Sequence, residues 1–187
     1  MTTSTRTHRS ALALASALAV SVAPAARAQQ PPQPAPEIQR MTALAGKFEG
    51  DASFTRDGKT VKFTLHHENR VISGGFGLQC HEEADIPGMG HYEAENLFGW
   101  DAGKRELHLF SVSNDPYAHD HAGRWTDATH ATLRYEGKHE GKSYLEAIPM
   151  EITSVNEYRF RSMVSIDGKP HDVFVATMKR VGQLSAR

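Results

Sequence analysis

The sequence contains a single cysteine, Cys80, among its 187 residues. An intramolecular disulfide and a four-cysteine zinc site are therefore both excluded. Basic and acidic residues nearly balance, at 21 and 22, so no basic field points to nucleic acid as a partner. A chain of this length can bury one hydrophobic core but not two comfortable ones. These absences predict one small, nearly neutral globular domain.

The long apolar stretch of the chain stands near its start. A basic segment with Arg6 and Arg9 precedes an Ala/Leu/Val run over residues 11–23, and an Ala-Arg-Ala sequence ends at Ala28. This order is typical of a secretory signal peptide, and the run is shorter than the roughly 20 residues of a membrane-spanning helix. We expect a signal peptide over residues 1–28, cleaved after Ala28, and a soluble exported protein, periplasmic in a bacterium. An uncleaved anchor is the alternative.

Cleavage at this point would change the charge of the protein. The first 28 residues carry three of the 21 basic residues and no acidic one, so the mature chain would have 18 basic and 22 acidic residues. The resulting net charge of −4 favours solubility and disfavours anionic partners.

A short tether and one helix are expected to precede the main domain. Residues 29–36 are almost all glutamine and proline, a composition that gives an extended linker. From Glu37 to Ala45 the apolar residues recur at helical spacing, and Gly46 stands where a helix commonly ends. We therefore predict a tether over 29–36 and one domain over 37–187 that opens with a short helix.

After Lys47 the apolar pattern changes to a period of two, which indicates strands with two different faces. Three runs show it clearly: Val61, Phe63 and Leu65; Tyr92 to Trp100 at every second residue; and Tyr158 to Ile166 at every second residue. Turn sequences such as Asp57-Gly58 and Asp167-Gly168 separate the runs. About ten strands fit between Lys47 and Arg180.

The connections between these strands are too short for parallel crossovers, so the sheet should be antiparallel. Closing it into an up-and-down barrel removes its exposed edges. We predict an all-β fold, an antiparallel up-and-down meander of about ten strands that closes into a barrel, with one short N-terminal helix. A β-sandwich is the alternative.

Several short motifs resemble a bacterial family built on a lipocalin-like domain of unknown function. Leu44 to Gly50 is similar to its opening Leu-x-Gly-x-Trp-x-Gly, with Phe48 in place of the tryptophan. Further similar segments follow along the chain: Gly74-Gly75-Phe76, in the place of its glycine-rich third strand, Gly99-Trp100-Asp101 with Lys104, Gly123-Arg124-Trp125, and Thr177 to Arg180. The resemblance implies a calycin-type barrel with an internal cavity and supplies no catalytic residues. The abundance of histidine departs from the family.

A barrel of about ten strands encloses more volume than an eight-stranded one filled by its own side chains. Aromatic and polar residues that share strand faces are therefore candidates for lining a ligand cavity. A small apolar or amphipathic molecule is the expected ligand, and simple filling of the barrel is the alternative. The candidate residues are Phe63, His67, Tyr92, Asn96, Phe98, Trp100, Leu133, Tyr135 and Arg161. Arg161 is included because an inward arginine could bind a ligand carboxylate.

Ten of the eleven histidines lie after Ala28. His119 and His121 would share one face of an extended strand and could bind zinc or copper if His108 or His130 supplied a third ligand. Haem is a further alternative, with His171 as its ligand.

The sequence lacks the usual catalytic templates. Ile72-Ser73-Gly74-Gly75 has neither the first glycine nor the following helix of a nucleophile elbow, and Gly74-Gly75-Phe76-Gly77 lacks the ending of a phosphate loop. These glycines more readily indicate a bulge or a bend in the barrel wall. An isomerase or hydrolase using His67 is the enzymatic alternative, and binding without catalysis is the leading expectation.

Overall fold

A computed structural model describes residues 31–184; the expected signal peptide lies outside them. One short helix, α1 (Pro36–Thr42), precedes ten strands and a single 3-10 turn, η1 (Ser73–Gly75). The strands are β1 (Gly46–Arg56), β2 (Lys59–Ile72), β3 (Gly77–Ile86), β4 (Gly90–Asp101), β5 (Glu106–Ser113), β6 (Ala118–Trp125), β7 (His130–His139), β8 (Lys142–Ser154), β9 (Glu157–Ile166) and β10 (Lys169–Gly182).

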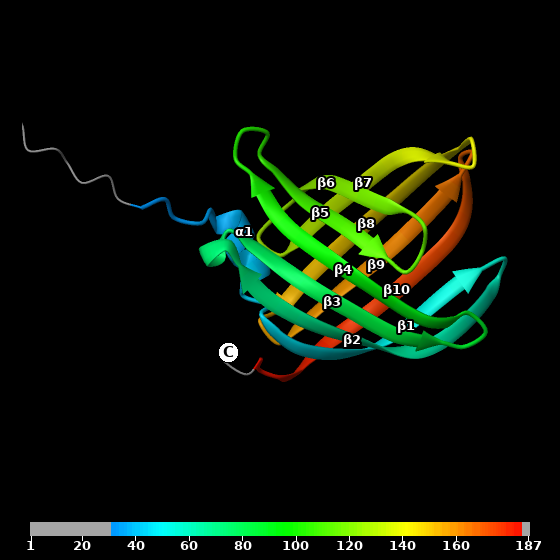
Figure 1. Cartoon of the computed structure of the whole chain (residues 1–187), viewed down its shortest axis with the longest axis horizontal. Helices are drawn as coiled ribbons and strands as arrows, with labels where there is room; N and C mark the ends of the chain where they lie inside the picture. Colours follow the sequence, from blue (N-terminus) through cyan, green and yellow to red (C-terminus); the bar gives the residue numbers. More distant parts are fainter. Residues whose placement is uncertain (1–30, 185–187) are drawn as a thin grey trace, which may run out of the picture. The chain divides into compact units, whose positions relative to one another are not determined.

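Each strand pairs antiparallel with the next, and β1 also pairs with β10, so the sheet closes into a barrel (Figure 1). The closing ladder is long, running from Phe48 opposite Arg180 to Arg56 opposite Asp172. The predicted all-β meander of about ten strands is confirmed. The alternative sandwich is wrong, because closure leaves no edge strand in the sheet.

The alternation seen in the sequence separates the interior of the barrel from its exterior. On β2 the side chains of Leu65, His67 and Asn69 are buried, whereas Lys62, Thr64 and His66 between or before them are exposed. Strands β4 and β9 alternate in the same way. The inner faces form one core that is continuous with the buried side of α1.

Helix α1 closes one end of the barrel. Its Ile38 and Met41, together with the following Leu44, are almost fully buried against the inner strand faces. The expected helix was longer, from Glu37 to Ala45 with a terminal glycine. Instead the helix ends at Thr42, two turn hydrogen bonds at Leu44 and Ala45 redirect the chain, and Gly46 begins β1.

Two arginines stabilise the pairing of β1 with β10, one at each end of the ladder. At the open end, Arg56 donates two hydrogen bonds to Asp172, at 2.7 and 2.6 Å. At the helix end, Arg180 donates to the carbonyls of Ala43, Ala45 and Val155, and its guanidinium lies over the Phe48 ring at 4.6 Å. The terminal motif containing Arg180 therefore ties the last strand to the residues that follow the helix.

The glycines at 74 and 75 do not lie within a strand. Gly74 and Gly75 have positive φ angles of 64° and 99° and form the turn between β2 and β3. The resemblance placed them in a third strand, and a bend in the wall was the other expectation. In the structure they instead form a tight turn between β2 and β3, at the end of the barrel that α1 closes.

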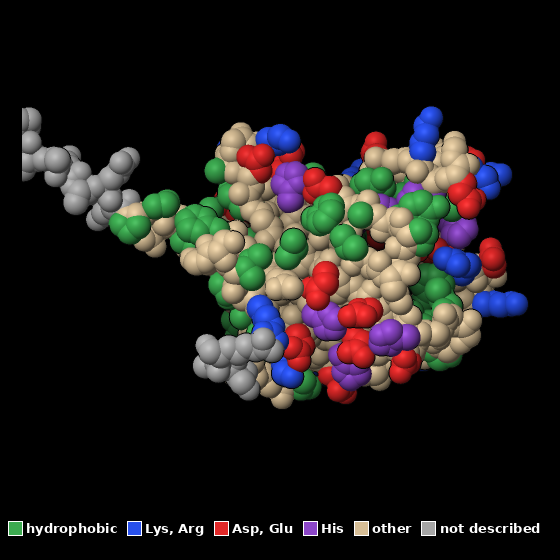
Figure 2. All heavy atoms as spheres, in the orientation of Figure 1, with side chains coloured by type: hydrophobic (Ala, Val, Ile, Leu, Met, Phe, Trp, Pro, Cys, Tyr) green, Lys and Arg blue, Asp and Glu red, His purple; other side chains and the backbone are tan. Residues whose placement is uncertain are grey.

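The outer surface is rich in histidine and acidic residues. Over β1 to β4, His66 lies near Glu49, His81 near Glu95 and His91 near Asp85, and purple and red side chains gather in one region of Figure 2. Among residues 31–184, no helix is long and apolar enough to cross a membrane.

Candidate functional site: a cavity inside the barrel

The barrel contains a cavity of about 1040 Å³ that reaches from the residues of the closed end, Met41 and Leu44, to the loops of the opposite end. Its mouth is lined by the loops that join β3 to β4, β5 to β6 and β7 to β8, and by the adjacent ends of β1, β9 and β10. Pockets for small molecules commonly measure a few hundred to about a thousand Å³. This cavity can therefore accommodate a ligand of considerable size.

Apolar side chains cover much of the wall. They include Leu78, Phe98, Leu109, Leu133, Ile148, Met150, Phe160 and Phe174. These residues come from strands all around the barrel, because each strand contributes its inward face. Such a surface favours the hydrocarbon or aromatic part of a ligand.

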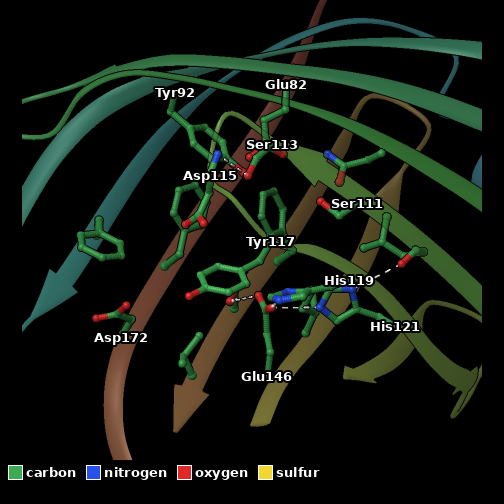
Figure 3. Close-up of a pocket in the computed structure, with 18 of the residues that line it drawn as sticks. Glu82, Tyr92, Ser111, Ser113, Asp115, Tyr117, His119, His121, Glu146 and Asp172 are labelled. Carbon is green, nitrogen blue, oxygen red and sulfur yellow. Dashed lines mark hydrogen bonds and ion pairs between the residues drawn. The ribbon is translucent and has the colours of Figure 1, made fainter. Parts of the chain in front are cut away.

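One side of the wall is polar instead. His119 and His121 on β6 point toward Glu146 on β8, as Figure 3 shows. The Nδ1 atom of His119 lies 3.3 Å from Oε2 of Glu146, and Nε2 of His121 lies 3.0 Å from the same oxygen. On β9, Ser162 donates its hydroxyl to the other oxygen, Oε1, at 2.6 Å. We call His119, His121 and Glu146 the inner triad.

The inner triad is largely shielded from solvent. The side chains of His119, His121 and Glu146 are 13%, 2% and 14% exposed. Burial alone would raise the pKa of Glu146, but hydrogen bonds from His119, His121 and Ser162 outweigh it and hold the pKa well below its usual range. Glu146 is therefore an anion inside a mostly apolar barrel.

Aromatic rings surround the inner triad where two strands separate. Ladder pairs between β6 and β7 extend only from Ala122 to Trp125 on β6, so the part of β6 that holds the two histidines has no backbone partner on β7. Ring stacking takes the place of the ladder there. His119 stacks on Tyr135 at 4.1 Å, and His139 stacks on Tyr117 at 3.9 Å and on Tyr144 at 3.7 Å.

His139 also contacts the inner triad directly. Its Nε2 lies 3.0 Å from Nε2 of His119. Burial, together with the neighbouring His119, lowers the pKa of His139, which favours the neutral ring. A neutral His139 can share one hydrogen bond with His119 without adding a charge beside it.

The nine residues predicted to line a cavity fall into three groups. Tyr92, Asn96, Phe98 and Leu133 line it. Phe63, His67, Trp100 and Tyr135 belong to inner strand faces but are packed into the wall rather than exposed to the cavity. Arg161 is exposed on the outside of β9, so its prediction as a cavity residue is wrong. Its alternation with the inward Phe160 and Ser162 directs it to water.

The histidines considered as metal or haem ligands lie in different places, some inside the barrel and some on its surface or at the cavity mouth. His119 and His121 do share one face, but His108 lies on the outer surface beside Asp120, at 3.1 Å. His130 is the first residue of β7, and its Nδ1 lies 3.0 Å from a carboxylate oxygen of Asp127. Neither His108 nor His130 can serve as the third ligand, because neither reaches the interior. His171 lies at the cavity mouth, where its Nδ1 is 2.8 Å from Asp172.

His67 belongs to a second buried group, near the closed end. Its Nδ1 lies 2.5 Å from the Tyr158 hydroxyl, and its Nε2 is 2.9 Å from Oε2 of Glu82. Burial raises the pKa of the Cys80 thiol beside it and raises that of Tyr158 to about 12. Glu82 reaches the cavity wall but His67 does not. This placement gives no support to His67 as a general base for a cavity substrate.

Sequence reasoning missed Glu146, Ser162, His139 and Tyr144, although a signal for Glu146 was present. Tyr144, Glu146, Ile148 and Met150 alternate along β8 after Lys142, so Glu146 is the single carboxylate on this face and its neighbours on both sides are uncharged. A lone charge on such a face indicates either a paired group or a binding group.

The comparisons with known proteins concern the fold. No protein-family model matches the sequence, and no curated protein sequence matches it. The structure is similar to that of Rv2717c from M. tuberculosis, with a TM-score of 0.57, 12% identity, and coverage of 79% of this chain and 99% of that one. It is also similar to the S-type phycobiliprotein lyase CPES from Guillardia theta, with a TM-score of 0.52, 10% identity, and coverage of 79% and 94%. Both are lipocalin-like barrels, and this chain shares their calycin-type fold.

Proposed function

We propose that this protein binds a small amphipathic molecule in its barrel cavity and acts outside the cytoplasm as a carrier or receptor for it. The observation that carries the proposal is the cavity itself, with about 1040 Å³ of space, an apolar wall and one buried polar side. A fully apolar ligand would leave Ser111, Asn96 and the inner triad facing hydrocarbon, which is costly. A ligand with one polar end satisfies both parts of the wall.

The export of the protein rests on the sequence of residues 1–28. The mature chain would be mildly acidic, a property that suits a freely diffusing binding protein. Secretion can be tested separately, by fractionating host cells and identifying the first residue of the mature chain, which we expect to be Gln29.

Two neighbouring residues on β5 provide a matched test of the cavity. Ser111 points inward and lines the cavity, whereas Val112 points outward and is 44% exposed. We expect Ser111→Trp to fill the cavity and to weaken binding of the dye 1-anilinonaphthalene-8-sulfonate about tenfold or more. A tenfold change corresponds to a loss of about 1.4 kcal/mol in binding free energy. Val112→Trp should leave dye affinity unchanged.

Dye fluorescence titration measures the affinity, and native mass spectrometry of protein purified from its own host identifies any retained ligand. Circular dichroism checks that both variants fold. Absence of dye binding by the folded wild type, or equal affinity in the two variants, would contradict the proposal.

A further inference from the structure

We propose that the inner triad of His119, His121 and Glu146 is a binding site for a divalent transition-metal ion, with zinc as the reference case. This inference goes beyond ligand binding by the cavity and does not depend on it. The two histidines and the carboxylate offer an N₂O donor set, which suits zinc and its neighbours among the transition metals. It leaves at least one coordination position for water or a cavity ligand.

The spacing of the donor atoms is the first argument. Zinc bonds of about 2.0–2.1 Å place tetrahedral ligand atoms roughly 3.3 Å apart. The two nitrogens lie 3.3 and 3.0 Å from Oε2 of Glu146. The three ligand atoms of the triad all lie within 4.8 Å of one another. An ion could therefore enter with only small side-chain adjustments.

The tautomer of His121 is the second argument. Its Nδ1 lies 3.3 Å from the carbonyl oxygen of Leu109, which can only accept, so Nδ1 carries the hydrogen. In the neutral ring Nε2 then presents a lone pair, and that lone pair faces a carboxylate oxygen 3.0 Å away. A proton between the two atoms makes the hydrogen bond described above, and a metal ion would take the place of that proton.

The third argument is that another group orients each donor of the triad. Ser162 holds the carboxylate of Glu146, the Leu109 carbonyl holds His121, and Nε2 of His139 contacts His119. Metal-binding histidines and carboxylates typically have such partners, which fix the ring tautomer and the direction of the lone pair. The arrangement thus extends beyond a chance meeting of three polar residues.

Bound metal would also supply a link that the sheet lacks. The part of β6 with His119 and His121 has no ladder partner on β7, and Glu146 belongs to β8, one strand further. An ion held by all three residues would connect β6 to β8 across this gap. We therefore expect binding to raise the Tm in a manner that depends on metal concentration.

The test uses the untagged mature chain, stripped with a chelator and titrated with Zn²⁺ by calorimetry and with Co²⁺ by visible absorption. We expect one equivalent to bind and the absorption of Co²⁺ to be that of a tetrahedral or five-coordinate site. Glu146→Gln keeps the shape of the side chain but removes its charge, and His119→Ala with His121→Ala removes both nitrogens. Each should weaken Zn²⁺ binding by at least about tenfold, since a coordinating ligand contributes at least as much as its outer partners.

Controls separate this site from other groups. The double variant His108→Ala with His130→Ala removes two histidines that lie outside the barrel, and it should bind Zn²⁺ as the wild type does. Cys80→Ser alters the group formed by His67, Cys80 and Glu82, the second set of donors that lie close together among residues 31–184, and it should also retain the ion.

Three results would overturn the proposal. They are a folded wild type that takes up no stoichiometric Zn²⁺ or Co²⁺, unchanged affinity in both triad variants, and loss of the ion only in Cys80→Ser. The first result would show that hydrogen bonds to Glu146 hold the inner triad together without a metal ion.

Discussion

Asp127 shows how one exposed carboxylate can organise a turn of this barrel. It accepts hydrogen bonds from the backbone N–H groups of Thr129 and His130, at 2.7 and 2.8 Å, and from the Thr129 hydroxyl at 3.1 Å. The two N–H groups hold the pKa of Asp127 well below its usual value of 3.8. The connection between β6 and β7 therefore depends on a charge.

We expect Asp127→Asn to lower the Tm at neutral pH and to lower it by progressively less as the pH falls below 3.8. A carboxylate whose pKa is lower in the folded state stabilises that state above its unfolded pKa of 3.8. This contribution is lost as the pH falls through that value toward the folded pKa. Thermal unfolding of both proteins over a pH series measures the effect. A difference in Tm that stays constant from neutral to acid pH would contradict it.

The histidines illustrate what could and could not be predicted for single residues. Alternation correctly places His67 on an inner face, and it places the pair at 119 and 121 on one common face without showing that this face points inward. It does not show that His119 and His121 meet Glu146, because β6 and β8 are separated by a strand. Which residues face one another across a barrel depends on strand order and tilt, and a single strand's pattern contains neither.

The packing between β6 and β7 leaves no room for a side chain at Gly123. A side chain added at Gly123 would overlap the Thr132 carbonyl oxygen and place Cβ 2.7 Å from the Cα of Leu133. Both neighbours are backbone atoms, which cannot move without breaking the ladder. At Gly99 on β4 an added Cβ would meet nothing within 4 Å. The two glycines differ only in their surroundings.

We therefore expect Gly123→Ala to reduce the free energy of unfolding by about 2–3 kcal/mol. Gly99→Ala should change it by less than about 1 kcal/mol. Urea denaturation monitored by circular dichroism gives both values. Equal stability in the two variants would show that β6 and β7 separate more easily than this packing implies.

The strands were the most predictable elements, and the helix end was the least. Alternating residues and two-residue turns are local signals, so β2, β4 and β9 could be located from them. The end of α1 depends instead on the carbonyls of Ala43 and Ala45 meeting Arg180, which is 135 residues beyond Ala45. No local pattern contains that contact. The wrong prediction for Arg161 has a simpler cause, because the apolar residues beside it in the sequence already indicate that its side chain points outward.

The molecule as a whole depends on its last strand for closure. Without β10, strands β1 and β9 would both present unpaired edges, and the core would lose Ala176 and Met178. Exposed edges favour association with other chains. The integrity of the barrel thus rests on a strand that is joined to β1 only through long-range pairing.

We expect a chain truncated after Gly168 to be aggregated and unable to bind the dye. Adding a synthetic peptide of residues 169–184 should restore a soluble barrel, because the peptide can pair with both edges. Size-exclusion chromatography with light scattering and dye fluorescence measure the two outcomes. A truncated chain that is monomeric and binds the dye unaided would show that nine strands suffice.

The positions of α1 and of the end of β10 give the barrel a direction. Both lie at the closed end, while the cavity opens among the loops of the opposite end (Figure 1). A support, a membrane anchor or a fused partner joined through either of these segments would leave the mouth pointing away from the attachment. The protein could therefore be immobilised on a sensor surface by either end and still exchange its ligand freely with the solution.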